Sequence, residues 1–571
     1  MRRRGESASF EAVAPLLRRQ SPQAARQVMK TRGEERAVSP DSLADAPTAA
    51  REAAPRGSAA VDAPRSARNS LLRHSPAVVL LAILVADSNR HTDPDLWGHI
   101  RFGQAFIASR HLIQHDPYSY SAPGAPWHDY EWLAEVVMAF VYNAAAVTGL
   151  KLWKFVCTAL AVIFVADSEA ETGASLSTQL LVLVIAALAL VLQMQLRPQM
   201  FTFVMLGALL SLLARHTYRR SAALWPAVPL MVLWANLHGG WIVGIATLAM
   251  YTAAAAIHDL AAGAGLRRAI RLAAITAGAV LATLLNPYGF GLWRAVAWAL
   301  LAPYKRLANA EWQPMFFALA QQWHQAHSGI FVYAAVLALM AALAVAFILA
   351  PDAKDLPLVA VAAMMCVGAW LSVRNMGLVA VTASAPLARH LDLLGQRWRG
   401  TAPARTSRPV NQYVIFALCA ALMLKTDFLS RRLDLDQPYP AGALAFMHAH
   451  QLNGRILNDW NWGDYLIWHA APASKVFIDG RDDTVYPLEV VRQYLLFRFD
   501  LPGASGVLDA YPHDYVLISR SAQALLVMER RRDWKLLYRD DSALLYARAS
   551  APVASLPNLP VIGTASLGVF P

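Results

Sequence analysis

The sequence predicts a polytopic α-helical membrane protein that carries a small soluble α/β domain at its C-terminus. Of the 571 residues, 56% are hydrophobic and only 16% are charged, whereas an ordinary soluble domain has about 25% charged residues. Apolar residues form long blocks such as 178–194 and 329–350, and a helix needs about 20 such residues to cross a bilayer. After about residue 427, short strand-like and helix-like segments alternate instead, which is typical of an α/β domain.

Residues 1–74 are rich in Arg, Ala, Ser and Pro and show no apolar period, so we expect a disordered cytoplasmic tail. A misassigned upstream start codon is an alternative explanation. No apolar stretch follows the early arginines until about residue 76, which argues against a signal peptide. Much of the net charge of +12 lies in this tail and in short loops, where it orients a membrane protein. No nucleic-acid motif accompanies it, so nucleic acid is not expected as a partner.

The apolar blocks predict a membrane domain over residues 75–426, with about 11–13 membrane spans in all. Several spans are short, as tilted or broken helices are. The candidate spans are 76–88, 133–149, 152–168, 178–194, 199–214, 224–237, 241–258, 270–285, 329–350, 356–373, 376–389 and 411–426.

Basic residues near the span ends predict the orientation. The clusters at 215–220, 267–271 and 389–408 should face the cytoplasm. The loop 89–132 and the domain 427–571 are then extracytoplasmic, in the inner (plasma) membrane of a bacterium. This orientation requires an odd number of spans, but the candidates are even in number. Either 176–196 is split, or 290–302 also enters the membrane.

The C-terminal domain, 427–571, predicts strands at 454–459, 475–481 and 514–520. Helices are expected at 486–497 and 521–533, and a hairpin at 534–548 that turns at Asp540–Asp541. A domain of this length can hold its own core.

The loop 89–132 is longer than a simple connector needs to be. It carries Asp93, Asp95, His99 and several further acids, interleaved with aromatic residues that include Trp97. Such residues suit a polar, ring-shaped substrate attached to a lipid, because carboxylates act as bases or metal ligands and aromatic rings stack on sugars. If 96–109 is helical, Asp95 and His99 lie one turn apart on one face. An interfacial helix with solvated charges is the alternative.

Further polar residues stand at the ends of spans. They are Arg197, His238, Asn286, Glu311, Arg374 and Asn375. Ionisable groups at membrane depth are costly and usually face a cavity or a partner. The predicted orientation places all but Arg197 on the same side as Asp95, while the side of Arg197 depends on the unresolved span. A structural role at a helix end remains open for each of them.

Other motifs give little support for a cofactor. No phosphate-binding GxxxxGK[ST] loop is present, which disfavours a nucleotide-dependent ATPase. The histidine pairs do not form a closed ligand set. Cys157, Cys366 and Cys419 all lie in apolar stretches and predict no disulfide framework. No cofactor is certain from the sequence, although a divalent metal ion remains possible.

An ordered series of short motifs carries a resemblance to a known superfamily. The series is DPDLWGHI, RPQMF, NLHGGW, NPYG, EWQP, RN, WGDYLIW and FIDGR, and it covers roughly residues 90–520. It resembles GT-C membrane glycosyltransferases, and most of all a bacterial group of GT-C-like proteins.

The resemblance implies a sugar donor linked to polyprenyl phosphate and a first-loop carboxylate that acts as base or metal ligand. The matching carboxylate is Asp95 or Asp93, with Asp95 preferred and also possible as a metal ligand. We expect the substrate to contact Trp97, His99, Arg197, His238, Glu311, Arg374 and Asn375, among which Arg197, His238 and Arg374 are assigned from charge to the donor phosphate or sugar.

The segment 458–468 resembles the WWDYG acceptor motif of oligosaccharyltransferases, but here Gly463 precedes Asp464. Asp464, Asp479 and Arg481 are therefore candidates for the acceptor side. A strand followed by a helix that carries core aromatic residues is an equally good interpretation.

The first functional hypothesis is therefore transfer of a lipid-linked sugar to an extracytoplasmic acceptor, with membrane lipids and the donor as partners. A transporter or flippase of a lipid-linked or polar solute is the second, and a non-catalytic membrane assembly protein is the third. The enzyme is favoured if Asp95, His238 and Arg374 surround one cavity, and the assembly protein if they face separate surfaces. The sequence does not identify the sugar, the acceptor, the metal requirement or the oligomeric state.

Overall fold

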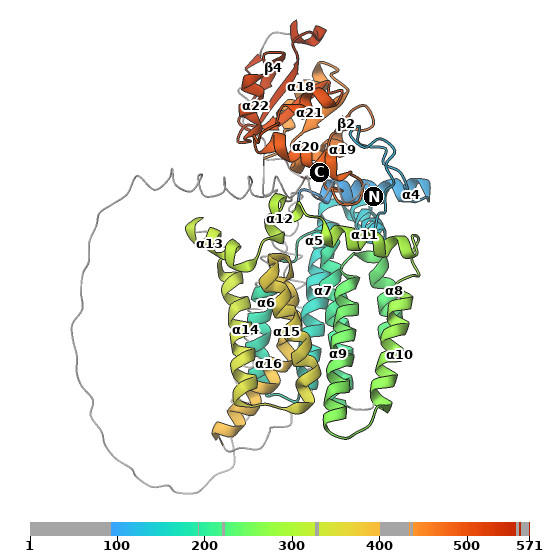
Figure 1. Ribbon diagram of the computed structural model, residues 1–571, viewed down its shortest axis with the longest axis vertical. Coiled ribbons are helices and arrows are strands. Elements are labelled where there is room, and N and C mark those ends of the chain that lie inside the picture. Colours follow the sequence, from blue (N-terminus) through green and yellow to red (C-terminus); the bar gives the residue numbers. More distant parts are fainter. Residues whose placement is uncertain are drawn as a thin grey trace, which may run out of the picture.

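A computed structural model describes residues 93–191, 193–219, 223–325, 330–399, 433, 438–555, 559–560 and 570. The expected tail 1–74 and the expected spans 76–88 and 411–426 lie outside the described residues. In Figure 1, long helices stand side by side and an α/β domain is stacked on one end of them. The expectation of a polytopic helical protein with a C-terminal α/β domain is confirmed.

Among the described residues, the helical domain has five helices that are long and apolar enough to cross a membrane. Several of these helices expose large apolar side chains, as lipid-facing helices do. In α14, for example, Phe331 and Ile348 are 74% and 73% exposed. The main helices of this domain, which include shorter ones such as α8 and α11, are α5 (Trp132–Glu171), α6 (Leu176–Val191), α7 (Gln199–Arg219), α8 (Ala227–Leu237), α9 (Trp241–Ala261), α10 (Arg267–Ala282), α11 (Phe290–Leu301), α14 (Ile330–Leu349), α15 (Leu356–Leu371) and α16 (Met376–Arg399).

The two expected spans, 133–149 and 152–168, are both helical, and the two helical segments meet at a sharp break inside α5. The break lies at Ala145 and Ala146, where Ala146 has a φ of 47°. No proline lies between the two predicted spans, so the sequence contains no strong helix breaker at this point. Residues 147–171, at 1.5 Å per residue, reach about 37 Å and can span a bilayer by themselves.

Short elements lie between the long helices and the α/β domain. Residues 96–109 do form a helix, α4 (Leu96–Ser109), which buries Leu96, Trp97 and Ile100. Figure 1 shows α4, α11 and α12 directly beneath the α/β domain. The short helices of this part of the chain are α12 (Lys305–Ala308), η1 (Ala310–Trp312), α13 (Met315–Gln325), η2 (Ala353–Asp355) and η3 (Val373–Asn375).

The α/β domain is built on a mixed sheet with the strand order β2-β1-β3-β5-β4-β6. The strands are β1 (Arg455–Asn458), β2 (Lys475–Val476), β3 (Tyr515–Ser519), β4 (Trp534–Arg539), β5 (Ala543–Arg548) and β6 (Leu559–Pro560). Its helices are α18 (Ala441–Ala449), η5 (Trp460–Trp462), α19 (Gly463–Ala470), α20 (Leu488–Arg498), α21 (Gly506–Ala510), α22 (Ala524–Arg530) and η6 (Pro552–Ser555). The predicted strands, helices and hairpin are all present, with small differences in their ends.

The largest difference is at β2, for which the sequence predicts 475–481. The strand ends at Val476, because the chain then turns towards the helical domain. The first loop pairs with this short strand: the amide of Tyr120 donates to the carbonyl of Val476 (3.1 Å), and the amide of Val476 donates to the carbonyl of Tyr118 (3.2 Å). The segment FIDGR therefore lies at the junction of the two domains.

Candidate functional site

A cavity of about 370 Å³ lies at the junction of the helices and the α/β domain. Acidic and basic side chains from both domains surround it. It is lined from the helical domain by Asp93, Asp95, His99, Glu131, Arg197, His238, Lys305, Glu311 and Arg374, and from the α/β domain by Trp460, Asp482, Asp483 and Arg498. Most of the residues that the sequence singled out therefore face one space.

Arg197 lies at the centre of three carboxylates. Its Nε is 2.6 Å from Asp93 Oδ2, its Nη2 is 2.7 Å from Asp95 Oδ2, and its Nη1 is 3.0 Å from Glu311 Oε1. The first loop, the start of α7 and the segment around η1 are thus held together by one guanidinium, whose planar geometry suits several carboxylates at once.

The two first-loop aspartates differ in their protonation. Burial, opposed by Arg197, raises the pKa of Asp93 to about 7. Burial also acts on Asp95, but Arg197 and then His99 outweigh it and hold the pKa of Asp95 below its usual range. Asp95 is therefore the carboxylate that is ionised at neutral pH, and its Oδ2 alone is bound by Arg197.

Arg374 and Lys305 supply the other positive charge of the cavity wall. Arg374 Nη1 is 3.3 Å from Glu311 Oε2, and its guanidinium lies 5.7 Å from the ring of Trp312. Lys305 pairs with Asp483 and lies 4.8 Å from the same ring. Arg374 thus has one carboxylate partner among the described ion pairs, whereas Arg197 has three.

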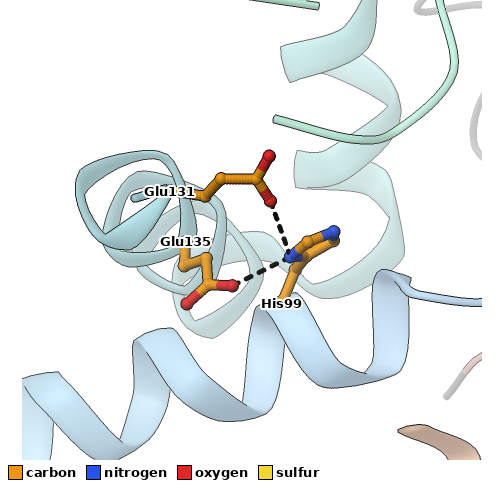
Figure 2. Close-up of side chains that lie close together, drawn as sticks. All are labelled: His99, Glu131 and Glu135. Atoms are coloured by element: carbon orange, nitrogen blue, oxygen red, sulfur yellow. Dashed lines mark hydrogen bonds and ion pairs between the residues drawn. The ribbon is translucent and has the colours of Figure 1, made fainter. Parts of the chain in front are cut away.

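His99, Glu131 and Glu135 form a second cluster beside Asp95 (Figure 2). His99 Nδ1 lies 2.9 Å from Glu135 Oε1 and 3.9 Å from Glu131 Oε2. The three candidate ligand atoms lie within 4.8 Å of one another, which suits a single divalent ion. A small cavity of about 50 Å³ opens against these side chains, which is enough for an ion or a water molecule. The residues present fit a metal ion.

His238 supports this cluster from the α8–α9 junction. The amide of Gly240 donates to His238 Nδ1 (2.9 Å), so the neutral ring carries its proton on Nε2. His238 Nε2 lies 3.3 Å from Glu131 Oε1. Burial lowers the pKa of His238 well below its usual value, and burial raises the pKa of Glu131 to about 7. His238 therefore orients Glu131 as a neutral hydrogen-bond donor.

Three of these residues, Glu135, Asp482 and Asp483, are not predicted from the sequence, and Glu131 is expected only as one of the acids of the first loop. Glu131 and Glu135 are spaced one helical turn apart at the start of α5, and this spacing was the available signal. Asp482 and Asp483 follow FIDGR directly, but only the fold brings them to the cavity. Burial, together with Asp483, raises the pKa of Asp482 to about 7.

Two expected substrate contacts lie elsewhere. Trp97 has no exposed surface and packs against Tyr465 (5.1 Å between centroids) and Phe570 (4.3 Å). It joins α4 to the α/β domain instead of facing the cavity. The side-chain amide of Asn375 donates to the carbonyl of Gly368 (3.0 Å), so this side chain fixes the turn between α15 and α16.

The expected acceptor-side residues also serve the domain junction. Arg481 Nη1 lies 2.9 Å from Asp116 Oδ1 of the first loop, and Arg481 Nη2 lies 2.7 Å from Asp479 Oδ2. The guanidinium is 4.7 Å from the ring of Trp127. Asp479 has no exposed surface. Asp464 lines the small cavity and not the large one.

These features define a class of protein: a polytopic membrane protein with a charged cavity enclosed by its first loop and an extramembrane α/β domain. No protein-family model matches the chain, and no curated protein matches it.

Solved structures do match. The chain is similar to the archaeal oligosaccharyltransferase AglB from Archaeoglobus fulgidus in complex with an inhibitory peptide and a dolichol-phosphate, at 13% identity and a TM-score of 0.48, covering 79% of this chain and 70% of that chain. It is similar to the arabinofuranosyltransferase AftD from Mycobacteria, at 16% identity and a TM-score of 0.43, covering 83% of this chain and 41% of that chain. It is also similar to ArnT from Cupriavidus metallidurans bound to undecaprenyl phosphate, at 14% identity and a TM-score of 0.44, covering 86% of this chain and 100% of that chain.

At TM-scores below 0.5, the likeness assigns neither an activity nor a residue's role to this chain.

Proposed function

We propose that this protein transfers a sugar from a polyprenyl-phosphate-linked donor to a hydroxyl group of an extracytoplasmic acceptor. The observation that carries the proposal is the cavity itself. An ionised carboxylate, Asp95, faces the same space as the cations Arg374 and Lys305 at the end of the helical domain. A base and positive charge on opposite sides of a reacting sugar are what such a transfer needs.

The reaction forms one bond and breaks one. The acceptor oxygen bonds to the anomeric carbon as the bond from that carbon to the phosphate oxygen breaks. Asp95 takes the proton of the acceptor hydroxyl, and polyprenyl phosphate leaves with the bonding electron pair. General base catalysis contributes about 10²–10⁴-fold, so stabilisation of the leaving phosphate must supply much of the remainder.

We assign the donor phosphate to Arg374 and not to Arg197. Arg197 already neutralises three carboxylates, whereas Arg374 is bound only to Glu311 among the described ion pairs. The wall of the cavity contains more acids than cations, and an anionic donor would be repelled from it without further positive charge.

A divalent ion held by His99, Glu131 and Glu135 fits this need. When bound, it would supply positive charge that attracts and neutralises the donor phosphate. His99 fixes one ligand atom on α4, and His238 holds Glu131 in place from behind. One nitrogen and two carboxylate ligands suit zinc or manganese better than calcium.

Asp95→Asn tests the proposal, because the amide keeps the shape of the side chain and cannot act as a base. We expect transfer to fall at least about 100-fold, with the protein still inserted in the membrane. The assay uses undecaprenyl-phosphate donors that carry a tritiated pentose, hexose or aminosugar, with membranes of a deletion strain as acceptor.

Asp541→Asn is the matched control, because Asp541 is 76% exposed at the β4–β5 turn. Parental transfer by Asp95→Asn removes Asp95 from the mechanism, and no transfer by the parental protein from any of these donors defeats the proposal as a whole.

Two other functions are weaker. A transporter requires a polar path along the helices, whereas the residues that line this cavity lie at helix ends, in connecting segments and in the α/β domain. A non-catalytic assembly protein has no need for Asp95, His238 and Arg374 to converge, and here they line one space.

A further inference from the structure

Two carboxyl groups from different domains meet beside one glycine. Asp464 lies in the first turn of α19, and Asp95 precedes α4 in the first loop. A Cβ atom placed on Gly480 would lie 2.6 Å from Asp464 Oδ2 and 2.7 Å from Asp95 Oδ1. Both oxygens therefore lie against the backbone of Gly480, and any larger residue at this position must displace one of them.

A second glycine encloses Asp464 from the helical domain. A Cβ atom on Gly98 of α4 would collide with Asp464 Oδ1 and lie 2.7 Å from its Cγ. Helices α4 and α19 are in contact here, and Asp464 is only 3% exposed. Its carboxyl group thus sits between a glycine of each domain, at the edge of the small cavity that Asp95 also lines.

The bonds of Asp464 point to a neutral acid. The amide of Gly480 donates to Oδ2 (3.1 Å), while Oδ1 is buried and has no hydrogen-bond partner among the described residues. Burial, together with Asp479 and Asp95 and against Arg481, raises the pKa of Asp464 well above its usual range. A protonated carboxyl group can donate a hydrogen bond without adding a second negative charge.

Several ionisable groups surround Asp95. Asp464 differs from the others in its position, because it lies at Gly480 on the side of Oδ1. Arg197 binds Oδ2 of Asp95, and Oδ1 lies against Gly480. The other ionisable groups that act on Asp95 are Asp93, His99, Glu311 and Asp482.

We propose that Asp464 is a positioning residue for Asp95, so that the base is complete only when the α/β domain is docked on the helices. This inference rests on the proposed function, in which Asp95 accepts the proton. Arg197 holds one carboxylate oxygen from the helical domain, and the acid of the α/β domain fixes the direction of the other. The role differs from the acceptor contact that the sequence resemblance implied for Asp464.

The test compares two replacements of Asp464 by steady-state kinetics with the tritiated donors. Asp464→Asn keeps a neutral side chain that donates hydrogen bonds, and we expect a kcat within about threefold of the parental value. Asp464→Ala removes the donor, and we expect kcat to fall at least about tenfold while the KM for the lipid donor changes less than about twofold, because small misplacements of a reacting group are costly.

Gly480→Ala should behave like Asp464→Ala, because the added methyl group displaces one of the two carboxyl groups. Gly506→Ala is the matched control, since a Cβ atom there meets open space.

Three results would overturn the inference. They are a parental kcat in Asp464→Ala, an equal loss of kcat in Asp464→Asn, and a rise in KM at unchanged kcat, which would return Asp464 to substrate binding. Each differs from failure of the proposed function, in which the parental protein itself transfers no sugar.

Discussion

Arg197 shows how one side chain sets the chemistry of the cavity. Its guanidinium pairs with Asp93, Asp95 and Glu311. It therefore keeps Asp95 ionised, and we assign the donor phosphate to Arg374 instead. The sequence predicts Arg197, His238 and Arg374 alike as contacts of the donor phosphate or sugar, because residue type and location do not reveal how many acids surround a cation.

Arg197→Ala should destabilise the protein by about 3–5 kcal/mol, because buried carboxylates lose the charge that pairs with them. Thermal unfolding in detergent measures the loss. Combining it with Asp93→Asn should recover part of the stability, since a neutral amide needs no counter-charge. Arg520→Ala is the control, because its pair with Asp541 is exposed and worth about 0–1 kcal/mol. Equal losses in the single and double variants would contradict this account.

His238→Ala should weaken binding of Mn²⁺ or Zn²⁺ about 10–100-fold without abolishing it, because His238 orients the ligand Glu131 and is not itself a ligand. Titration calorimetry on the purified protein measures the affinity independently of transfer. His258→Ala, at the far end of α9, should leave the affinity unchanged. If His238→Ala abolishes binding altogether, His238 is itself a ligand.

Several residues of the cavity could be predicted from the sequence, because they are polar or charged and lie at span ends on one predicted side of the membrane. Asp95, His238, Glu311 and Arg374 stand next to spans on one predicted side of the membrane, and they do line one cavity. Asp479 and Arg481 looked equally suitable, but they pair with each other, and Arg481 also binds Asp116 of the first loop. A contact between residues so far apart in the chain leaves no trace in local spacing.

At the level of elements, hydropathy predicts helices better than it predicts their ends. The blocks at 178–194 and 329–350 became α6 and α14. The spans predicted at 133–149 and 152–168 are two helical segments, but the break between them lies at Ala145 and Ala146, a few residues earlier than hydropathy predicts. The strand predicted at 475–481 is short because Gly480 and Arg481 lie at the domain junction, against Asp95 and Asp116 of the first loop.

The junction depends on Arg481, which joins Asp116 of the first loop to Asp479. Arg481→Ala should cost about 3–5 kcal/mol, because two buried carboxylates lose their partner. Limited proteolysis should then release the C-terminal domain from membranes more readily. Arg492→Ala, which breaks an ion pair within α20, should have little effect. Parental resistance to protease in Arg481→Ala would show that aromatic packing alone holds the junction.

For the whole molecule, the proposed orientation places the cavity outside the cytoplasm. In a protein whose native cysteines are replaced by alanine, His111→Cys in the first loop should react with an impermeant maleimide in intact cells. Ala264→Cys, between α9 and α10, should react only after the membrane is permeabilised. Both positions are exposed. The reverse pattern would place the cavity inside and end the proposal of an extracytoplasmic acceptor.

The pairing of residues 118–120 with β2 has a practical consequence for protein production. A gene fragment that begins at residue 438 encodes every strand of the sheet but lacks the segment that covers its outer edge. Uncovered edge strands recruit other chains, so this fragment should aggregate when expressed alone. Supplying a peptide of residues 110–130 in trans should keep it in solution.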